Sequence, residues 1–275
     1  MTDFLKKMAA ASAARAATVK RRFRDAELDR PRLPLALDRF DVIAELKDSS
    51  PSAGRLASPD DDRVARAVDY ARGGAAAVSV LTEPQHFAGA LGHLDEVARA
   101  LQAHGIPAMR KDFLVARVQV AEARAAGASG VLLIAAMLDD ATLADLLSAS
   151  WDHGMFVLLE CFDADDLERT ARLFRQPRIA ARADAGLLLA GVNTRNLRTL
   201  AVDPARLAAL AAHLPAGAAV VAESGLASAA DAAEAAALGY RLALVGSALM
   251  RAAEPARLIR DMLDAGRARH AASSP

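Results

Sequence analysis

Short apolar runs alternate along most of the chain with longer, alanine-rich stretches whose apolar residues recur at helical spacing. Apolar runs of about four to eight residues between turn residues are typical of buried strands, and longer amphipathic stretches indicate helices. The pattern predicts eight strands, which begin near residues 42, 76, 107, 130, 156, 187, 219 and 242. Consecutive starts lie 23 to 34 residues apart, so each unit has room for a strand, a crossover helix and two loops.

Eight strand-helix units are the number that closes a parallel barrel. We therefore predict an α/β fold, a (β/α)8 TIM barrel, that occupies residues 1–275 as a single domain with an N-terminal helical extension over residues 1–36. The length of the chain also allows two ordinary domains, and an open doubly wound sheet is the alternative for the same alternation. No strand-helix junction carries a G-x-G-x-x-G pattern, which favours the barrel.

Turn and capping residues agree with these units, and one connection is unusually long. Residues 58–75 begin with Ser58 and three aspartates suited to cap a helix, and they end with Gly73 and Gly74, which stop it. Residues 172–186 lengthen the connection between the fifth helix and the sixth strand. Connections of this kind lie at the bottom of a barrel, so we predict a tolerated surface insertion there.

The N-terminal stretch lacks the long apolar core of a signal peptide or membrane anchor. Its alanine, lysine and arginine content predicts a helix, and Phe4, Leu5 and Met8 at helical spacing suggest that this helix packs as a lid or a brace. A basic, acid-poor transit peptide is the alternative interpretation of the same residues.

Charge and cysteine content narrow the classes of partner. Lysine plus arginine equals aspartate plus glutamate at 34 each, so no overall field attracts nucleic acid or an anionic membrane. Cys161 is the only cysteine, which excludes an internal disulfide and suits a reducing compartment. We expect a cytoplasmic protein, a monomer with no obligate protein partner, and Cys161 as a buried apolar side chain.

Charged and amide side chains gather at the predicted carboxyl ends of the strands, where barrel active sites are built. They are Glu45, Lys47, Lys111, Glu160, Asn193, Arg195 and Glu223. Alternation places Glu45 and Lys47 on one face of the first strand, and Lys111 on the same face as Met109 and Phe113. A lone buried pair of this kind is most often a structural ion pair, but so many at one end of the barrel indicate a catalytic site.

Small polar residues near three strand ends predict an anion site. "SSPS" follows the first strand, "ESG" the seventh and "VGSALM" the eighth. Backbone N–H groups and hydroxyls after the seventh and eighth strands are the usual phosphate site of this fold. Each stretch alone is ordinary turn chemistry; together they predict a phosphorylated small-molecule substrate.

Other chemistries find no support in the sequence. The six histidines form no H-x-x-x-H or H-x-x-E-H arrangement, and no G-x-S-x-G elbow is present. We therefore expect no metal and no cofactor, and we interpret Met137, Met155 and Met250 as core filler.

Eight segments, in order along nearly the whole chain, resemble the indole-3-glycerol phosphate synthase family. They are "VIAELKDSSPSAG", "VSVLTEPQHFAGAL", "MRKDFLV", "EARAAGASGVLLIAAML", "LLECFDADDL", "GVNTRNLRTLAVD", "VAESGL" and "LVGSALMR". The resemblance implies a carboxy-lyase of tryptophan biosynthesis. Its substrate, 1-(2-carboxyphenylamino)-1-deoxyribulose 5-phosphate, closes a ring and loses carbon dioxide and water to give indole-3-glycerol phosphate.

The resemblance also implies roles for individual residues. Lys111 is similar to the general acid at the ketone, Lys47 to the lysine that holds the substrate carboxylate, and Glu160 to the general base of the dehydration. Glu45 would lie beside the lysines and Asn193 would hydrogen-bond the intermediate. The implied binding residues are Ser50, Ser224, Gly225, Gly246 and Ser247 around the phosphate, Pro51, Phe87, Phe113 and Leu133 around the aromatic ring, and Arg195 and Glu223 as polar support.

Three residues depart from the family pattern. Phe162 stands where a polar residue is more usual, two positions after the glutamate, and Ala88 and Ala90 replace other residues after Phe87. We expect these to affect turnover rather than reaction class. The rivals are phosphoribosylanthranilate isomerase, the α subunit of tryptophan synthase, and a catalytically silent barrel that serves as a binding module.

Overall fold

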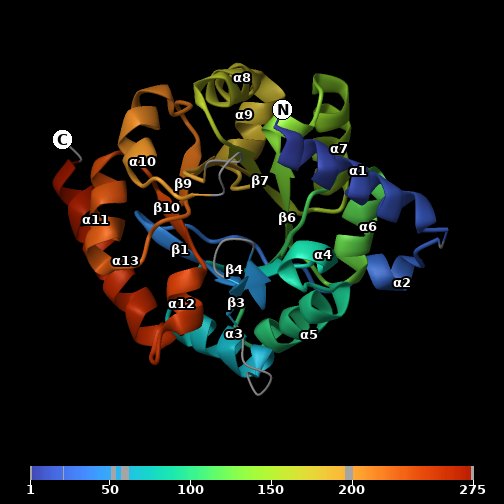
Figure 1. Cartoon of the computed structure of the whole chain (residues 1–275), viewed down its shortest axis with the longest axis horizontal. Coiled ribbons are helices and arrows are strands. Elements are labelled where there is room, and N and C mark those ends of the chain that lie inside the picture. Colours follow the sequence, from blue (N-terminus) through green and yellow to red (C-terminus); the bar gives the residue numbers. More distant parts are fainter. Residues whose placement is uncertain (1, 21, 51–53, 57–61, 196–200, 274–275) are drawn as a thin grey trace.

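The computed structural model describes the whole chain except residues 1, 21, 51–53, 57–61, 196–200 and 274–275. Eight parallel strands form a closed barrel, and helices surround it (Figure 1). The strands follow one another around the barrel in chain order, as β1 (Asp41–Leu46), β4 (Ala77–Leu81), β5 (Ala108–Lys111), β6 (Gly130–Ile134), β7 (Phe156–Cys161), β8 (Leu188–Asn193), β9 (Ala219–Glu223) and β10 (Leu242–Val245). The predicted (β/α)8 barrel and its eight strands are confirmed.

The helices that complete the eight strand-helix units lie outside the barrel, one after each strand. They are α3 (Arg63–Arg72), α5 (Leu91–Gln102), α6 (Arg117–Ala125), α7 (Asp140–Asp152), α8 (Ala164–Phe174), α10 (Ala205–Leu210), α11 (Ala229–Ala237) and α13 (Pro255–Ser273). Shorter elements occupy the connections: the hairpin of β2 (Ser49–Ser50) and β3 (Gly54–Arg55), helices α4 (Pro84–Phe87), α9 (Pro177–Asp184) and α12 (Ser247–Arg251), and the 3-10 turns η1 (Ala135–Met137) and η2 (Ala211–His213). None of the helices in the described part of the chain is long and apolar enough to cross a membrane.

Side chains of each strand alternate between two apolar layers. In β7, Val157, Leu159 and Cys161 pack toward the surrounding helices, whereas Phe156 and Leu158 fill the barrel interior. Cys161 is fully buried, in agreement with its prediction as an apolar core residue. Because both faces of every strand are buried, the strands read as continuous apolar runs.

Two helices precede the first strand, where the extension was predicted. Helix α1 (Asp3–Thr18) lies along one side of the barrel mouth, where it contacts η1 and passes beside α7, and α2 (Asp25–Leu28) lies against α6 (Figure 1). Leu5 of α1 joins the interior apolar layer, and Met8 is also buried. The chain continues to the opposite end of the barrel, where Leu35 and Leu37 pack against the same interior layer.

The structure agrees with the predicted end of one helix and corrects the prediction for the long connection. Helix α3 begins at an N-cap, Asp62, which accepts hydrogen bonds from two backbone N–H groups, and it ends at Gly73 as predicted; Ser58 lies outside the described residues. The 172–186 stretch is more than a surface insertion, because its residues 177–184 form helix α9. Ile179 of that helix is buried in the outer apolar layer, and Arg182 stacks on the Trp151 ring at 5.5 Å.

Candidate active site

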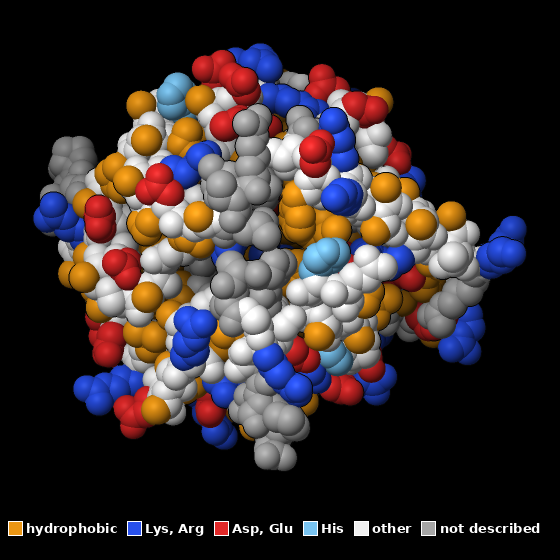
Figure 2. All heavy atoms as spheres, in the orientation of Figure 1, with side chains coloured by type: hydrophobic (Ala, Val, Ile, Leu, Met, Phe, Trp, Pro, Cys, Tyr) orange, Lys and Arg blue, Asp and Glu red, His pale blue; other side chains and the backbone are white. Residues whose placement is uncertain are grey.

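The side chains predicted to act meet at the carboxyl ends of the strands. Figure 2 shows the face of the molecule that corresponds to the view in Figure 1: acidic and basic side chains are mixed around its rim, and apolar side chains border a hollow near its centre. Two adjoining cavities lie there and share the charged residues of β1, β5 and β8. One is walled mostly by apolar side chains, and the other by small and polar ones.

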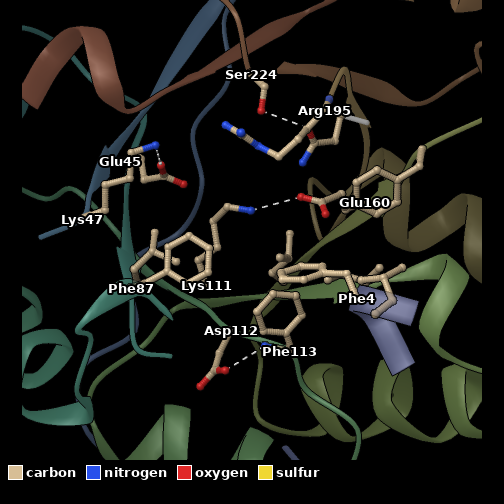
Figure 3. A pocket seen from close by; sticks show the side chains of 16 residues that line it. Phe4, Glu45, Lys47, Phe87, Lys111, Asp112, Phe113, Glu160, Arg195 and Ser224 are labelled. Atoms are coloured by element: carbon tan, nitrogen blue, oxygen red, sulfur yellow. Dashed lines mark hydrogen bonds and ion pairs between the residues drawn. The ribbon is translucent and has the colours of Figure 1, made fainter. Parts of the chain in front are cut away.

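Lys111 lies at the centre of the site (Figure 3). Its Nζ is 3.1 Å from Glu160 Oε2 and 3.7 Å from Glu223 Oε2, and both carboxylates are almost completely buried. Burial alone would lower the pKa of Lys111, but the carboxylates, above all Glu160 and Glu223, raise it above its ordinary value. The ammonium is therefore charged and already desolvated before a substrate enters.

Glu223 carries the opposite perturbation. Burial, and after it the nearby charge of Glu160, raises the pKa of Glu223 well above its ordinary value. Neither of its carboxyl oxygens accepts a hydrogen bond from the described residues. Lys111 Nζ lies closer to Glu160 than to Glu223, so Glu160 is the main partner of the ammonium.

Lys47 and Glu45 form a second pair on the first strand. Lys47 Nζ lies 2.7 Å from Glu45 Oε1, and both side chains are largely buried. Burial pushes the pKa of Glu45 upward, but Lys47 and Lys111 outweigh it and hold the pKa below its ordinary value. The two residues share one face, as the alternation predicted.

Asn193 and Ser224 form a hydrogen-bonded corner beside the charged groups. Ser224 Oγ donates to Asn193 Oδ1 at 2.9 Å, and the backbone N–H of Arg195 donates to the same oxygen at 3.0 Å. Ser224 and Gly225 both adopt positive φ, which makes the sharp turn after β9. The half-buried guanidinium of Arg195 faces the carboxylates of Glu45 and Glu160. Because Ser224 Oγ and the Arg195 N–H both donate to the carbonyl oxygen of Asn193, its NH₂ group faces the cavity as a donor.

Aromatic and aliphatic side chains form the apolar half of the site, as Figure 3 shows for the labelled rings. Phe87 and Phe113 lie there as predicted, with ring centroids 6.4 Å apart. Among the described residues, the apolar lining is Phe4, Leu5, Leu81, Phe87, Phe113, Leu132, Ile134 and Phe162. The cavity, including the part open to solvent, has an empty volume of about 750 Å³.

Leu133 does not line this cavity. It belongs to the outer layer between the barrel and the helices, and its neighbours Leu132 and Ile134 point inward instead. Strand β6 is apolar on both faces, so composition gives no indication of which residues face the interior. Gly130 is the signal that was missed: a Cβ at this position would collide with the Phe156 ring inside the barrel, so positions 130, 132 and 134 face inward.

The polar half of the site lies beside the turns after β9 and β10. Gly225, Gly246 and Ser247 line it together with Ser224, and Arg251 of α12 lies at its edge. Pro51 lies outside the described residues, and the structure describes only the backbone of Ser50. Two residues that sequence reasoning placed elsewhere or left out also face the cavities: Phe4, which was assigned only to a lid or brace, and Asp112, which stands inside the "RKDF" motif.

Of the departures from the family pattern, Phe162 lies on the wall of the site, and Ala88 and Ala90 do not line either cavity. Phe162 is buried and extends the apolar lining next to Glu160. Ala88 ends α4 with φ at 55°, a left-handed conformation that is unfavourable for a residue with a Cβ. Within the described part of the chain, histidine, cysteine, aspartate and glutamate side chains form no group of three suited to hold a metal ion.

The fold and the site define a (β/α)8-barrel enzyme that pairs lysine ammoniums with carboxylates between an apolar pocket and a small polar one. A family model described as indole-3-glycerol phosphate synthase matches residues 5–262. A protein of that name from Micrococcus luteus is 47% identical over 220 residues, 80% of this chain and 76% of that protein. Another, from Rhizorhabdus wittichii, is 43% identical over 250 residues, 91% of this chain and 87% of that protein. The chain belongs to the indole-3-glycerol phosphate synthase family.

Solved structures of lower identity agree with the fold. The 3-hexulose-6-phosphate synthase of Salmonella typhimurium aligns with a TM-score of 0.58 at 17% identity, covering 84% of this chain and all of that one. The thiamine phosphate pyrophosphorylase of Pyrococcus furiosus aligns with a TM-score of 0.57 at 13% identity, over 84% of this chain and 97% of that one. These likenesses support the barrel architecture alone.

Proposed function

We propose that the chain converts 1-(2-carboxyphenylamino)-1-deoxyribulose 5-phosphate into indole-3-glycerol phosphate, carbon dioxide and water. The observation that carries the proposal is the order of the three parts of the site. An apolar pocket with phenylalanine rings suits the anilino ring, the lysines and carboxylates suit the carboxylate and ketone, and the turns after β9 and β10 suit the phosphate.

Ring closure is the first step. The ring carbon that carries the carboxylate attacks the ketone carbon, and negative charge develops on the ketone oxygen. Lys111 acts as the general acid: its ammonium, held by Glu160 at 3.1 Å, stabilises that oxygen and transfers a proton to it. A raised pKa keeps Lys111 protonated in the free enzyme, so the acid is in its required form when substrate enters.

Lys47 holds the substrate carboxylate until carbon dioxide leaves. Its Nζ contacts Glu45 at 2.7 Å, so the pair is neutral and an entering carboxylate adds a second partner to the ammonium. Loss of carbon dioxide from the ring carbon restores the electron pair to the ring system. Lys47 and Lys111 thus have different roles, because different carboxylates surround them.

Dehydration completes the indole. After ring closure Lys111 regains a proton from solvent. Glu160 then acts as the general base that removes a proton from the intermediate, and the hydroxyl formed in the first step leaves as water with the proton of Lys111. Asn193 donates to the intermediate, since Ser224 and Arg195 already occupy its carbonyl oxygen. Arg195 and Glu223 support this polar set.

The phosphate lies between backbone N–H groups. Gly225, Gly246, Ser224 and Ser247 surround this end of the site, and the resemblance to the family adds Ser50 of the first loop as a further phosphate ligand. Phe87 and Phe113 line the wall around the anilino ring, and the predicted Pro51 lies outside the described residues. Leu132 and Ile134 take the place that was assigned to Leu133.

The test removes Lys47 and follows folding and turnover together. Lys47→Ala is expected to keep a cooperative unfolding transition while product formation, measured by indole absorbance, falls by about 10² or more. Lys6→Ala, on the exposed face of α1, is the matched control and keeps wild-type turnover. Wild-type turnover in folded Lys47→Ala would contradict the role assigned to this lysine.

We also propose that the enzyme is cytoplasmic and that it works as a monomer without an obligate protein partner. The lone buried Cys161 suits a reducing compartment. The described residues assigned to the site come from the barrel and its own N-terminal helix, which supports a monomer. Sedimentation at micromolar concentration tests the monomer.

A further inference from the structure

Helix α1 contacts the barrel mouth through polar side chains as well as apolar ones. Ser12 is fully buried in the contact, and the side chain of Arg15 is 29% exposed. One nitrogen of the Arg15 guanidinium lies 2.6 Å from Asp112 Oδ1, and the other lies 3.6 Å from Glu83 Oε1. A single side chain of the N-terminal extension therefore bridges two loops of the barrel.

Both carboxylates in this bridge are almost completely buried, with exposures of 3% for Asp112 and 1% for Glu83. Asp112 has a second cation, Arg110, whose guanidinium donates to it at 2.9 Å. Arg15 is the one lysine or arginine that pairs with Glu83 among the described residues. Without Arg15, Asp112 would keep Arg110, whereas the buried Glu83 would lose its lysine or arginine partner, and a buried charge without its partner is costly.

Asp112 connects the bridge to the proposed general acid. It directly follows Lys111, its Oδ1 accepts the backbone N–H of Phe113 at 2.8 Å, and its Oδ2 accepts the hydroxyl of Thr82 at 2.9 Å. The carboxylate thus fixes the backbone at the end of β5, between the ammonium and a ring of the apolar pocket. Figure 3 shows Lys111, Asp112 and Phe113 in succession along this wall.

Glu83 connects the bridge to the opposite ring. Its carboxylate caps α4 by accepting backbone N–H groups, including that of His86 at 2.7 Å and that of Phe87 at 3.2 Å. Phe87 ends this short helix and faces Phe113 across the pocket. The orientation of the Phe87 ring therefore depends on the carboxylate that Arg15 neutralises.

We propose that Arg15 is a positioning residue for ring closure, a role that rests on the proposed function. By bridging Asp112 and Glu83, its guanidinium sets the spacing between the strand end that carries Lys111 and the helix that carries Phe87. The aromatic ring of the substrate is thereby held level with the Lys111 ammonium, in position for attack on the ketone. Small displacements of a reacting group from its attack geometry are costly in rate, by about 10² per ångström.

A second contact from α1 holds the same loop. Gln119 Nε2 donates to Ser12 Oγ at 2.8 Å, and Gln119 Oε1 accepts the backbone N–H groups of Val115 and Ala116. The loop after β5 is therefore fixed at two points by one helix. Helix α1 acts as a brace through these contacts, in addition to the wall that Phe4 and Leu5 supply.

The test separates positioning from stability. Arg15→Ala is expected to lower kcat by about 10- to 100-fold with a much smaller change in KM, because the phosphate and carboxylate contacts are unchanged. Arg15→Lys keeps one charge but cannot span two carboxylates, so it is expected to fold like the wild type and still lose most of kcat. Lys7→Ala, an exposed residue of the same helix, removes the same charge and keeps wild-type kcat.

A double-mutant cycle supplies the second readout. Asp112→Asn removes one end of the bridge, so Arg15→Ala is expected to cost less in that background than in the wild type, whereas Lys7→Ala adds independently. Equal kcat for wild type and folded Arg15→Lys, or full additivity with Asp112→Asn, would overturn the positioning role. Failure of the proposed function gives a different result: no turnover by the wild type itself.

Discussion

Gly246 and Gly191 stand where buried carboxylates approach the backbone of a neighbouring strand. A Cβ at position 246 would lie 2.7 Å from Lys47 Nζ and would also collide with Glu45 Oε1. A Cβ at position 191 would collide with Glu223 Oε1. The absence of a side chain at these positions lets the carboxylates pack inside the barrel beside the lysines that they neutralise.

Gly246→Ala is expected to displace the Lys47–Glu45 pair and to narrow the phosphate end of the site. We expect kcat/KM to fall by about 10- to 100-fold, with a rise in KM, because the added methyl group meets both charged side chains. Steady-state kinetics on the purified variant measures the effect. Gly92→Ala, at a helical position with open space around the new Cβ, is the control, and an equal loss there would refute the steric argument.

Glu223 gives stability a pH dependence whose sign is fixed by its raised pKa. The folded protein holds a proton on Glu223 that the unfolded chain releases at lower pH, so this residue contributes stability at acidic pH that is lost as pH rises through its folded pKa. Glu223→Gln retains a neutral side chain at every pH. Its unfolding free energy relative to wild type is therefore expected to rise between pH 5 and pH 8, as urea titrations at both values would show.

Glu234→Gln, on the exposed surface of α11, provides the comparison for that titration. It is expected to shift the unfolding free energy by the same small amount at both pH values. If the unfolding free energy of Glu223→Gln relative to wild type were also the same at both pH values, the buried carboxyl would be ionised in the folded protein.

The sequence predicted the charged residues of the site better than its apolar wall. A charge at the end of an apolar strand is conspicuous, so Lys111 and Glu160 could be selected one by one, and the structure brings them to 3.1 Å. Leu133 could not be oriented, because a strand buried on both faces carries no polar alternation. The Arg15–Asp112 contact joins residues 97 positions apart, and no local pattern marks it.

At the scale of elements, the strands were predictable and the short helices were not. Each strand is an apolar run bounded by turn residues. The run therefore locates the strand, although the predicted end residues can differ from the observed ones by one or two positions. Helices α4 and α9 span only 4 and 8 residues, too few for a helical period to stand out. Helix α4 depends on a tertiary element, since its cap Glu83 pairs with Arg15 from the N-terminal helix.

Helix α9 offers a test of the long connection. Ile179→Ala is expected to destabilise the protein by about 2 kcal/mol or more, because the side chain is buried in the outer apolar layer. Turnover of the folded enzyme is expected to stay at the wild-type level, since α9 precedes β8 at the end of the barrel opposite the site. Urea unfolding and initial rates measure the two quantities.

The matched substitution in the same helix is Arg178→Ala, whose side chain is exposed. It is expected to change the unfolding free energy by less than about 0.5 kcal/mol. If Ile179→Ala were equally harmless, the connection would be the tolerated surface insertion that the sequence suggested.

At the scale of the whole molecule, the N-terminal extension ties the two ends of the barrel together. Leu5 and Arg15 act at the mouth, and Leu33 donates its backbone N–H to Ser129 near the start of β6. The barrel supplies the charged groups, while the extension closes the apolar end of the site with Phe4. An apolar cavity and a small polar one adjoin at Lys111, an order that suits the anilino ring and the phosphate of the proposed substrate.

The most direct test of the account is indole absorbance when purified wild-type protein meets 1-(2-carboxyphenylamino)-1-deoxyribulose 5-phosphate, with folded Lys111→Ala measured alongside. The account predicts indole-3-glycerol phosphate from the wild type and a rate lower by about 10² or more in the variant, since the acid at the ketone is gone. Absence of product from well-folded wild-type protein, or equal rates in the two proteins, would contradict it.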